Sequence, residues 1–105
     1  MAIDKDIALV EYLLRHTRTG AIKWEPTAET RAEQYTTSFN GKYTVIINSS
    51  LDVGCWLDLK DTDNRNLMTI TASDYPPVND LFSLVKRASL NVDAAIDEII
   101  NDIPF

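Results

Sequence analysis

The sequence predicts a single α+β domain in which helices cover one face of an antiparallel sheet. A helical pattern opens the chain, strand patterns fill its middle, and two helical patterns close it. The chain has 105 residues, the usual size of one domain, and is 45% hydrophobic and 25% charged, as globular proteins are. We therefore expect residues 1–105 to form one unit: an N-terminal helix, a four-stranded β-meander and two C-terminal helices packed on one sheet face.

The first helix is expected from about Asp4 to Thr17, because apolar residues recur there at helical spacing. Gly20 then supplies the stop signal. Residues 22–25 are a candidate short strand, closed by Pro26. Residues 27–34 have no apolar face and are expected to form a mobile connector, or at most one turn of helix.

The clearest element is a β-hairpin that pairs residues 35–39 with 42–47. Its loop, Asn40-Gly41, tolerates the positive φ angles that a type I′ turn requires. A two-residue loop places Thr44 and Ile46 on the same face as the odd-numbered residues of the first strand. Tyr43, Val45 and Ile47 then share the other face with Thr36 and Ser38. Both faces are mixed, so the pattern does not decide which one meets the helices.

The third strand, residues 55–60, alternates cleanly. Cys55, Leu57 and Leu59 point to one side, and Trp56, Asp58 and Lys60 to the other. A polar turn leads to a fourth strand at 67–71, and adjacent prolines within 73–79 end the sheet. Helices are expected at about 80–89 and after Asn91 or Asp93. The apolar stripe of the last helix consists of Ile96, Ile99, Ile100 and Ile103.

The net charge of −6 is unevenly placed. Residues 1–50 carry six acids and six bases, whereas residues 51–105 carry ten acids and four bases. No base follows Val92. Such a surface repels phosphate backbones, so general nucleic-acid binding is not expected and a partner with a basic surface is favoured.

The chain also lacks the features of membrane and secreted proteins. It has no long apolar run, and its first residues lack the basic start and apolar block of a signal peptide. Its single cysteine, Cys55, excludes an intramolecular disulfide. These features predict a cytoplasmic protein with no membrane contact.

No pattern in the sequence indicates catalysis, a metal site or a cofactor. His16 and Cys55 are the only residues of their kinds. His16 fits a position at the end of a helix, and Cys55 fits a buried strand position. These interpretations are favoured over a catalytic pair. The turn at 61–66 lacks the glycine and the later carboxylate of a calcium loop, and the glycines form no phosphate loop. We therefore expect a protein that is not an enzyme.

Two segments carry a resemblance: Leu13–Glu25, with the pattern T-x-x-G-x-I-x-W, and Leu90–Ile100. Together they resemble small α+β proteins of bacteria and their phages that lack an assigned activity. In those proteins a helix leads through this motif into a meander, and helices close the chain. The resemblance implies the same fold, a microbial intracellular setting and an inhibitor-, immunity- or anti-defence-like role. It transfers no active residue.

The leading hypothesis is a small acidic protein that acts through protein–protein contact, as a monomer or as a self-associating dimer. An aromatic sheet surface would anchor the partner, and the acidic last helix would select a basic one. The outward position of Trp56 depends on which sheet face is open. The residues expected to carry this contact are Tyr43, Trp56, Asp97, Glu98 and Asp102.

The alternative hypothesis is a binder of a small anionic ligand such as a nucleotide. Arg15, Arg18 and Lys23 would contact the anion, and Trp24 would stack on it. A competing interpretation places Trp24 in the core, where it closes the space between the first helix and the sheet, while the bases reach into water.

Overall fold

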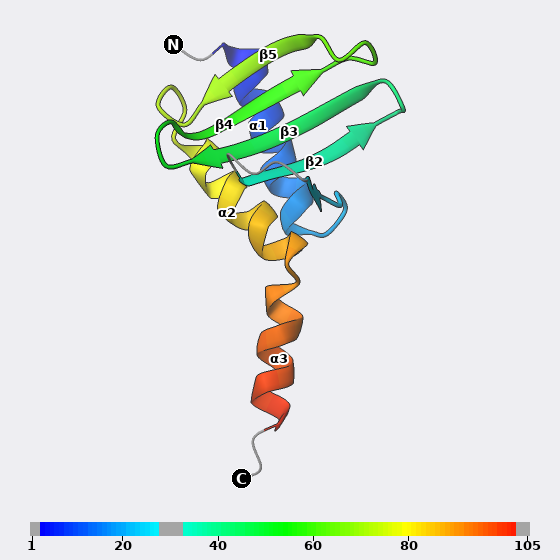
Figure 1. The fold of residues 1–105 in the computed structure, drawn as a ribbon, viewed down its shortest axis with the longest axis vertical. Helices are drawn as coiled ribbons and strands as arrows, with labels where there is room; N and C mark the ends of the chain where they lie inside the picture. The colour runs from blue at the N-terminus through cyan, green and yellow to red at the C-terminus, as the bar shows by residue number, and fades with distance from the viewer. Residues whose placement is uncertain (1–2, 28–32, 103–105) are drawn as a thin grey trace.

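A computed structural model of the protein describes residues 3–27 and 33–102 and confirms the α+β class (Figure 1). The helices and strands follow the predicted order along the chain. Their bounds are α1 Asp4–Arg18, β1 Glu25–Pro26, β2 Glu33–Phe39, β3 Tyr43–Ser50, β4 Gly54–Lys60, β5 Asn66–Thr71, α2 Pro77–Ser89 and α3 Val92–Asp102.

The sheet has five antiparallel strands in the order β1-β2-β3-β4-β5, rather than the predicted four. The added strand is β1, which pairs Glu25 with Thr36 and Pro26 with Tyr35. The sequence predicts a short strand at residues 22–25 that Pro26 ends, so only Glu25 agrees and Pro26 lies within the strand. A pairing of two residues leaves no alternation from which its place in a sheet can be predicted. The predicted connector is also shorter than expected, because residues 33 and 34 belong to β2. Residues 28–32 lie outside the described part of the chain.

The β2–β3 turn has the predicted backbone, but the predicted register is wrong. Asn40 and Gly41 have φ angles of 57° and 66°, and the amide of Lys42 donates to the carbonyl of Phe39 at 3.0 Å. The strands nevertheless pair Phe39 with Tyr43, one residue later than a two-residue loop requires. A one-residue shift moves a whole strand to the other face. The shift gathers apolar side chains of both strands, and buried Tyr35, Val45 and Ile47 share the face toward the helices.

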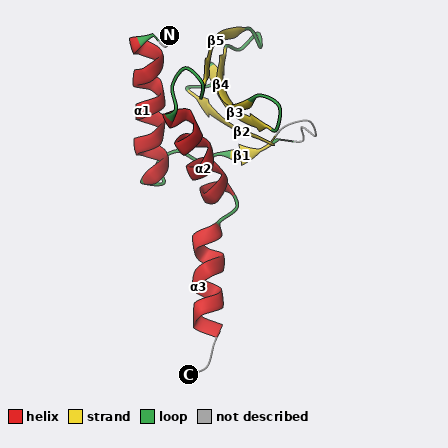
Figure 2. Cartoon of the chain, turned by 90° about the vertical axis from the view of Figure 1, so that its left-hand side faces the viewer, coloured by secondary structure: helices red, strands yellow, loops and turns green. Residues whose placement is uncertain are grey.

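α1 and α2 lie on the same side of the sheet, and no described helix lies on the other side (Figure 2). Cys55 and Leu57 point toward the helices, as their alternation allowed, and Trp56 points away. The prolines that end the sheet also begin α2, because proline fits the first helical position. The helix therefore starts at Pro77, earlier than the predicted 80. The buried apolar residues of the core are Val10, Leu13, Leu14, Trp24, Tyr35, Val45, Ile47, Cys55, Leu57, Ile70, Val78, Leu81, Phe82 and Val85.

The last helix does not pack on the sheet, so the prediction of two C-terminal helices on its face is wrong for α3. α3 has no buried residue in its described length and projects away from the sheet and the other helices (Figure 1). The molecule measures 53 × 29 × 28 Å, and its radius of gyration is 15.2 Å, against about 13 Å for a compact domain of this length. Two features explain the projection. Asn91 leaves the helical conformation at a φ of 55°, and α1 and α2 already occupy the helix-bearing face.

Candidate functional site

Trp56 lies on the sheet face that no described helix covers, and hydrogen bonds hold it there. Its indole Nε1 donates to Oδ2 of Asp58 at 3.2 Å. The other carboxylate oxygen, Oδ1, accepts a hydrogen bond of 2.5 Å from the hydroxyl of Thr69 on β5. The ring is half-buried rather than projecting. Trp56 thus contributes a fixed aromatic edge to a face that also carries Ile46, opposite Asp58.

The polar network continues across the sheet to β2. The amide Nε2 of Gln34 donates to Oδ1 of Asn48 at 2.7 Å, and the hydroxyl of Thr27 donates to Oε1 of Gln34 at 2.8 Å. Asn48 is 1% exposed and lies opposite Trp56 in the register of β3 and β4. Sequence reasoning missed Asn48 because the predicted strand ended at Ile47. The cross-strand register brings these amides together, and that register was not available from the sequence.

The structure does not join Tyr43 and Trp56 into one aromatic surface. Tyr43 begins β3 at the hairpin tip, and its register places it on the helix-bearing side of the sheet. Its side chain is partly exposed there, beside a small hollow that the two neighbouring turns enclose. Because Trp56 lies on the opposite face, the expected aromatic anchor is split between two surfaces.

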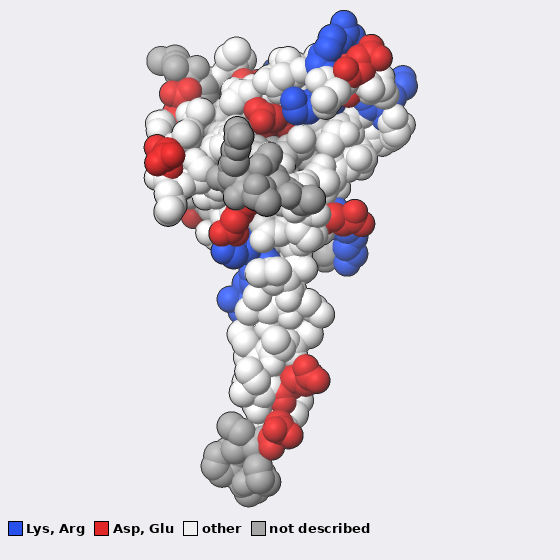
Figure 3. All heavy atoms as spheres, in the orientation of Figure 1, with Lys and Arg blue, Asp and Glu red and all other residues white. Residues whose placement is uncertain are grey.

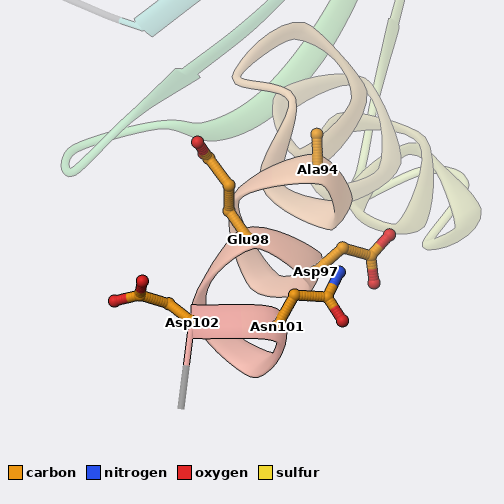
Figure 4. Close-up of a pocket in the computed structure, with 5 residues that line it drawn as sticks. All are labelled: Ala94, Asp97, Glu98, Asn101 and Asp102. Atoms are coloured by element: carbon orange, nitrogen blue, oxygen red, sulfur yellow. The ribbon is translucent and has the colours of Figure 1, made fainter. Parts of the chain in front are cut away.

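The three predicted acids of α3 lie on its polar side, with Ala94 and Asn101 between them (Figure 4). Helical spacing puts Asp97 beside Ile100 and Asp102 beside Ile99, so carboxylates flank the apolar stripe on both sides. Figure 3 shows a long uncharged stretch on α3, with acidic side chains gathered on one side of the helix near its end. The hollow between these acids lies on a single helix and is open to solvent.

The apolar stripe of α3 is the feature that sequence reasoning misplaced. The side chains of Ile96, Ile99 and Ile100 are 39%, 64% and 63% exposed. They were expected to pack on the sheet, since a stripe at helical spacing is normally buried. The fourth predicted position, Ile103, lies outside the described residues. Within the sequence, the run of four acids without a base was the signal that this helix differs from α1 and α2.

The basic residues of the alternative hypothesis lie near the end of α1, but Trp24 does not share their surface. Arg15, Arg18 and Lys23 are exposed, whereas Trp24 is only 6% exposed. The indole Nε1 donates to the hydroxyl of Thr17 at 2.9 Å, inside the core. The interpretation of Trp24 as a core residue is therefore confirmed. An anion at this end of α1 would meet guanidinium and ammonium groups without an indole face.

Cys55 and His16 lie on different elements, and the described residues form no metal-holding cluster. Cys55 is buried on β4 beneath the helices, while His16 stacks on Tyr12 along α1 with ring centroids 4.3 Å apart. No three His, Cys, Asp or Glu side chains in residues 3–27 and 33–102 are grouped to hold a metal ion. The pKa of Asp61 is lowered, chiefly because the backbone amide of Arg65 donates to its carboxylate. Asp61 thus organises the β4–β5 turn.

Comparison with known proteins provides no family for this chain. No family model, no curated protein and no solved structure matches it. Among the helices that the structure describes, none is long and apolar enough to cross a membrane.

Proposed function

We propose that the protein acts by binding another protein through α3, and that this partner presents an apolar groove with a basic rim. The observation that carries the proposal is the exposed stripe of Ile96, Ile99 and Ile100 on a projecting helix. The proposed function keeps the expected protein–protein contact but moves its anchor from the sheet aromatics to the isoleucines.

Binding of a partner to α3 would be favourable because it would bury exposed apolar surface. Burying an isoleucine side chain is worth about 1.5–3 kcal/mol, and all three isoleucines keep a large part of their surface in water. α3 has 11 residues, and isolated helices shorter than about 12–15 residues are marginal in water. A groove that accepts the stripe would bury this surface and stabilise the helix in the same step.

The charges of α3 select the kind of partner. Asp93 pairs with Arg87 at the root of the helix, with 2.6 Å between carboxylate and guanidinium. Asp97, Glu98 and Asp102 make no ion pair with any residue that the structure describes. A second α3 packed along the first would bring like charges together. A basic rim would instead neutralise both flanks of the stripe and speed encounter.

Occlusion is the mode of action that fits this geometry. A projecting helix that fills a groove blocks whatever else that groove binds. This is how an inhibitor or an immunity-like factor works without any chemistry of its own, in keeping with the expected absence of enzyme activity.

Site-specific photocrosslinking tests the proposal. A photoreactive phenylalanine analogue replaces Ile99, or Leu51 as the control; Leu51 is 106% exposed in the β3–β4 turn, outside α3. In cells that express the protein, we expect position 99 to capture a distinct protein that position 51 does not. Substituting Asp97, Glu98 and Asp102 with asparagine or glutamine should weaken that capture. Equal capture from both positions would contradict the proposal. So would capture at position 99 that is unchanged when the three acids are substituted.

A further inference from the structure

β5 is an edge strand with backbone groups free to pair. It is last in the sheet order, and β4 is its only neighbour among the described strands. The amide of Ala72 donates to the carbonyl of Cys55 at 2.9 Å, which sets the alternation of the ladder. Met68 and Ile70 therefore bond inward to β4, and the amide and carbonyl of Thr69 point outward. Among the residues that the structure describes, nothing pairs with the outward amide and carbonyl of Thr69.

The two edges of the sheet differ in how well they resist pairing. β1 is only two residues long, and its Pro26 has no amide hydrogen to donate. β5 is six residues long, Asn66-Leu-Met-Thr-Ile-Thr71, with no charge and no proline. Charges, prolines and short length are the usual means by which an edge avoids a second chain. β5 lacks these three features, and its one irregularity is a bulge at Leu67, where the pairing with β4 shifts between Leu59 and Lys60.

We infer that β5 pairs antiparallel with β5 of a second copy of this chain, about a two-fold axis at Thr69. In this register Thr69 exchanges hydrogen bonds with its counterpart, and the amide of Thr71 donates to the carbonyl of the other Leu67. The return bond, from the amide of Leu67 to the carbonyl of Thr71, is not made in this register, because that carbonyl already accepts from the amides of Asp74 and Tyr75 at 3.2 and 3.0 Å. A register centred on Ile70 would lose more, because there the outward amide of Thr69 would itself have to bond the occupied carbonyl. The turn that leads into α2 thus disfavours the shifted register.

The side chains fit the same register. Met68 comes to lie beside Ile70 of the other copy on the helix-bearing face, and no like charges oppose each other. α1 begins at the β5 side of the sheet (Figures 1 and 2). Leu67 lies on β5 itself and is 50% exposed. α3 projects from the other side of the molecule, so the dimer is independent of the proposed function.

The test is the oligomeric state of the full-length protein, measured by sedimentation over a wide range of concentration. The key variant is Leu67→Lys, which puts a charge on the edge. The matched control is Leu51→Lys, which makes the same change in the β3–β4 turn. We expect a dimer for the natural protein, an unchanged dimer for Leu51→Lys, and a dissociation constant raised about tenfold or more for Leu67→Lys.

Two further measurements keep the inference falsifiable if Leu67→Lys folds poorly. Thr69→Pro removes an outward amide that makes no bond to β4, so the monomer should fold while the dimer is lost. In the natural protein, the amides of Thr69 and Thr71 should exchange slowly at high concentration and quickly on dilution. A protein that stays monomeric, or an equal loss of dimer in Leu51→Lys, would overturn the inference. A dimer lost in Ile99→Lys but kept in Leu67→Lys would place the contact on α3 instead.

Discussion

The indole Nε1 of Trp24 donates a hydrogen bond to the hydroxyl of Thr17 across 2.9 Å, and both side chains are buried. This bond ties the last turn of α1 to the segment that leads into β1. It holds the indole inside the core.

The bond can be measured with a double-mutant cycle. Thr17→Val keeps the shape of the side chain but leaves the indole N–H unsatisfied, which should lower the free energy of unfolding by about 1–3 kcal/mol. In a Trp24→Phe background the same change should cost much less, because no buried donor remains. Urea denaturation of the four proteins gives the coupling. If Thr17→Val lowers the free energy of unfolding equally in both backgrounds, the hydrogen bond contributes nothing to stability.

α3 should be the least stable helix of the free protein. It buries no residue in its described length, whereas α2 buries Val78, Leu81, Phe82 and Val85. We expect α3 amides to exchange at least about a hundredfold faster than those in the middle of α2, since local opening of α3 exposes no core. Hydrogen exchange followed by NMR measures both helices in one sample. Equal protection would show that α3 is covered in solution.

Charge reversal on α3 should slow binding to the protein captured at position 99. Replacing Asp97, Glu98 and Asp102 with lysine should lower the association rate about tenfold or more at low salt, and less at high salt. The control replaces exposed Asp52, Asp63 and Asp74 with lysine, which changes the net charge by the same amount. Stopped-flow measurements compare the two variants. An equal effect of both would assign the steering to net charge rather than to α3.

The β4–β5 turn should loosen in acid because of Asp61. Its carboxylate accepts from the amides of Arg65 and Asp63 at 3.0 and 2.9 Å, and these bonds hold its pKa below the ordinary value. A pKa that is lower in the folded state stabilises the turn above the unfolded-state pKa, and this contribution is lost as the pH falls through the folded-state value. NMR titration of the carboxylates measures it directly. A curve for Asp61 with its midpoint at the ordinary value of an aspartate side chain would contradict this account.

The positions of the helices and of most strands could be predicted because they depend on local signals. Apolar spacing marks α1, the alternation from Cys55 to Lys60 marks β4, and Asn40-Gly41 marks the turn with its positive φ angles. Each signal reflects the dihedral preference of a few neighbouring residues or the burial of one face. The same signals predicted that Trp56 and Cys55 point to opposite sides of the sheet.

Only the tertiary structure decided which predicted faces are covered. The register that puts Tyr43 on the helix-bearing side depends on burying Val45 and Ile47 together with Tyr35, across two strands. The exposure of Ile96 and Ile99 depends on the space that α1 and α2 leave on the sheet. A stripe of isoleucines shows that a helix has an apolar side. Whether that side is buried depends on which helices occupy the sheet face. Those helices are distant in the chain, so the residues of α3 itself do not reveal it.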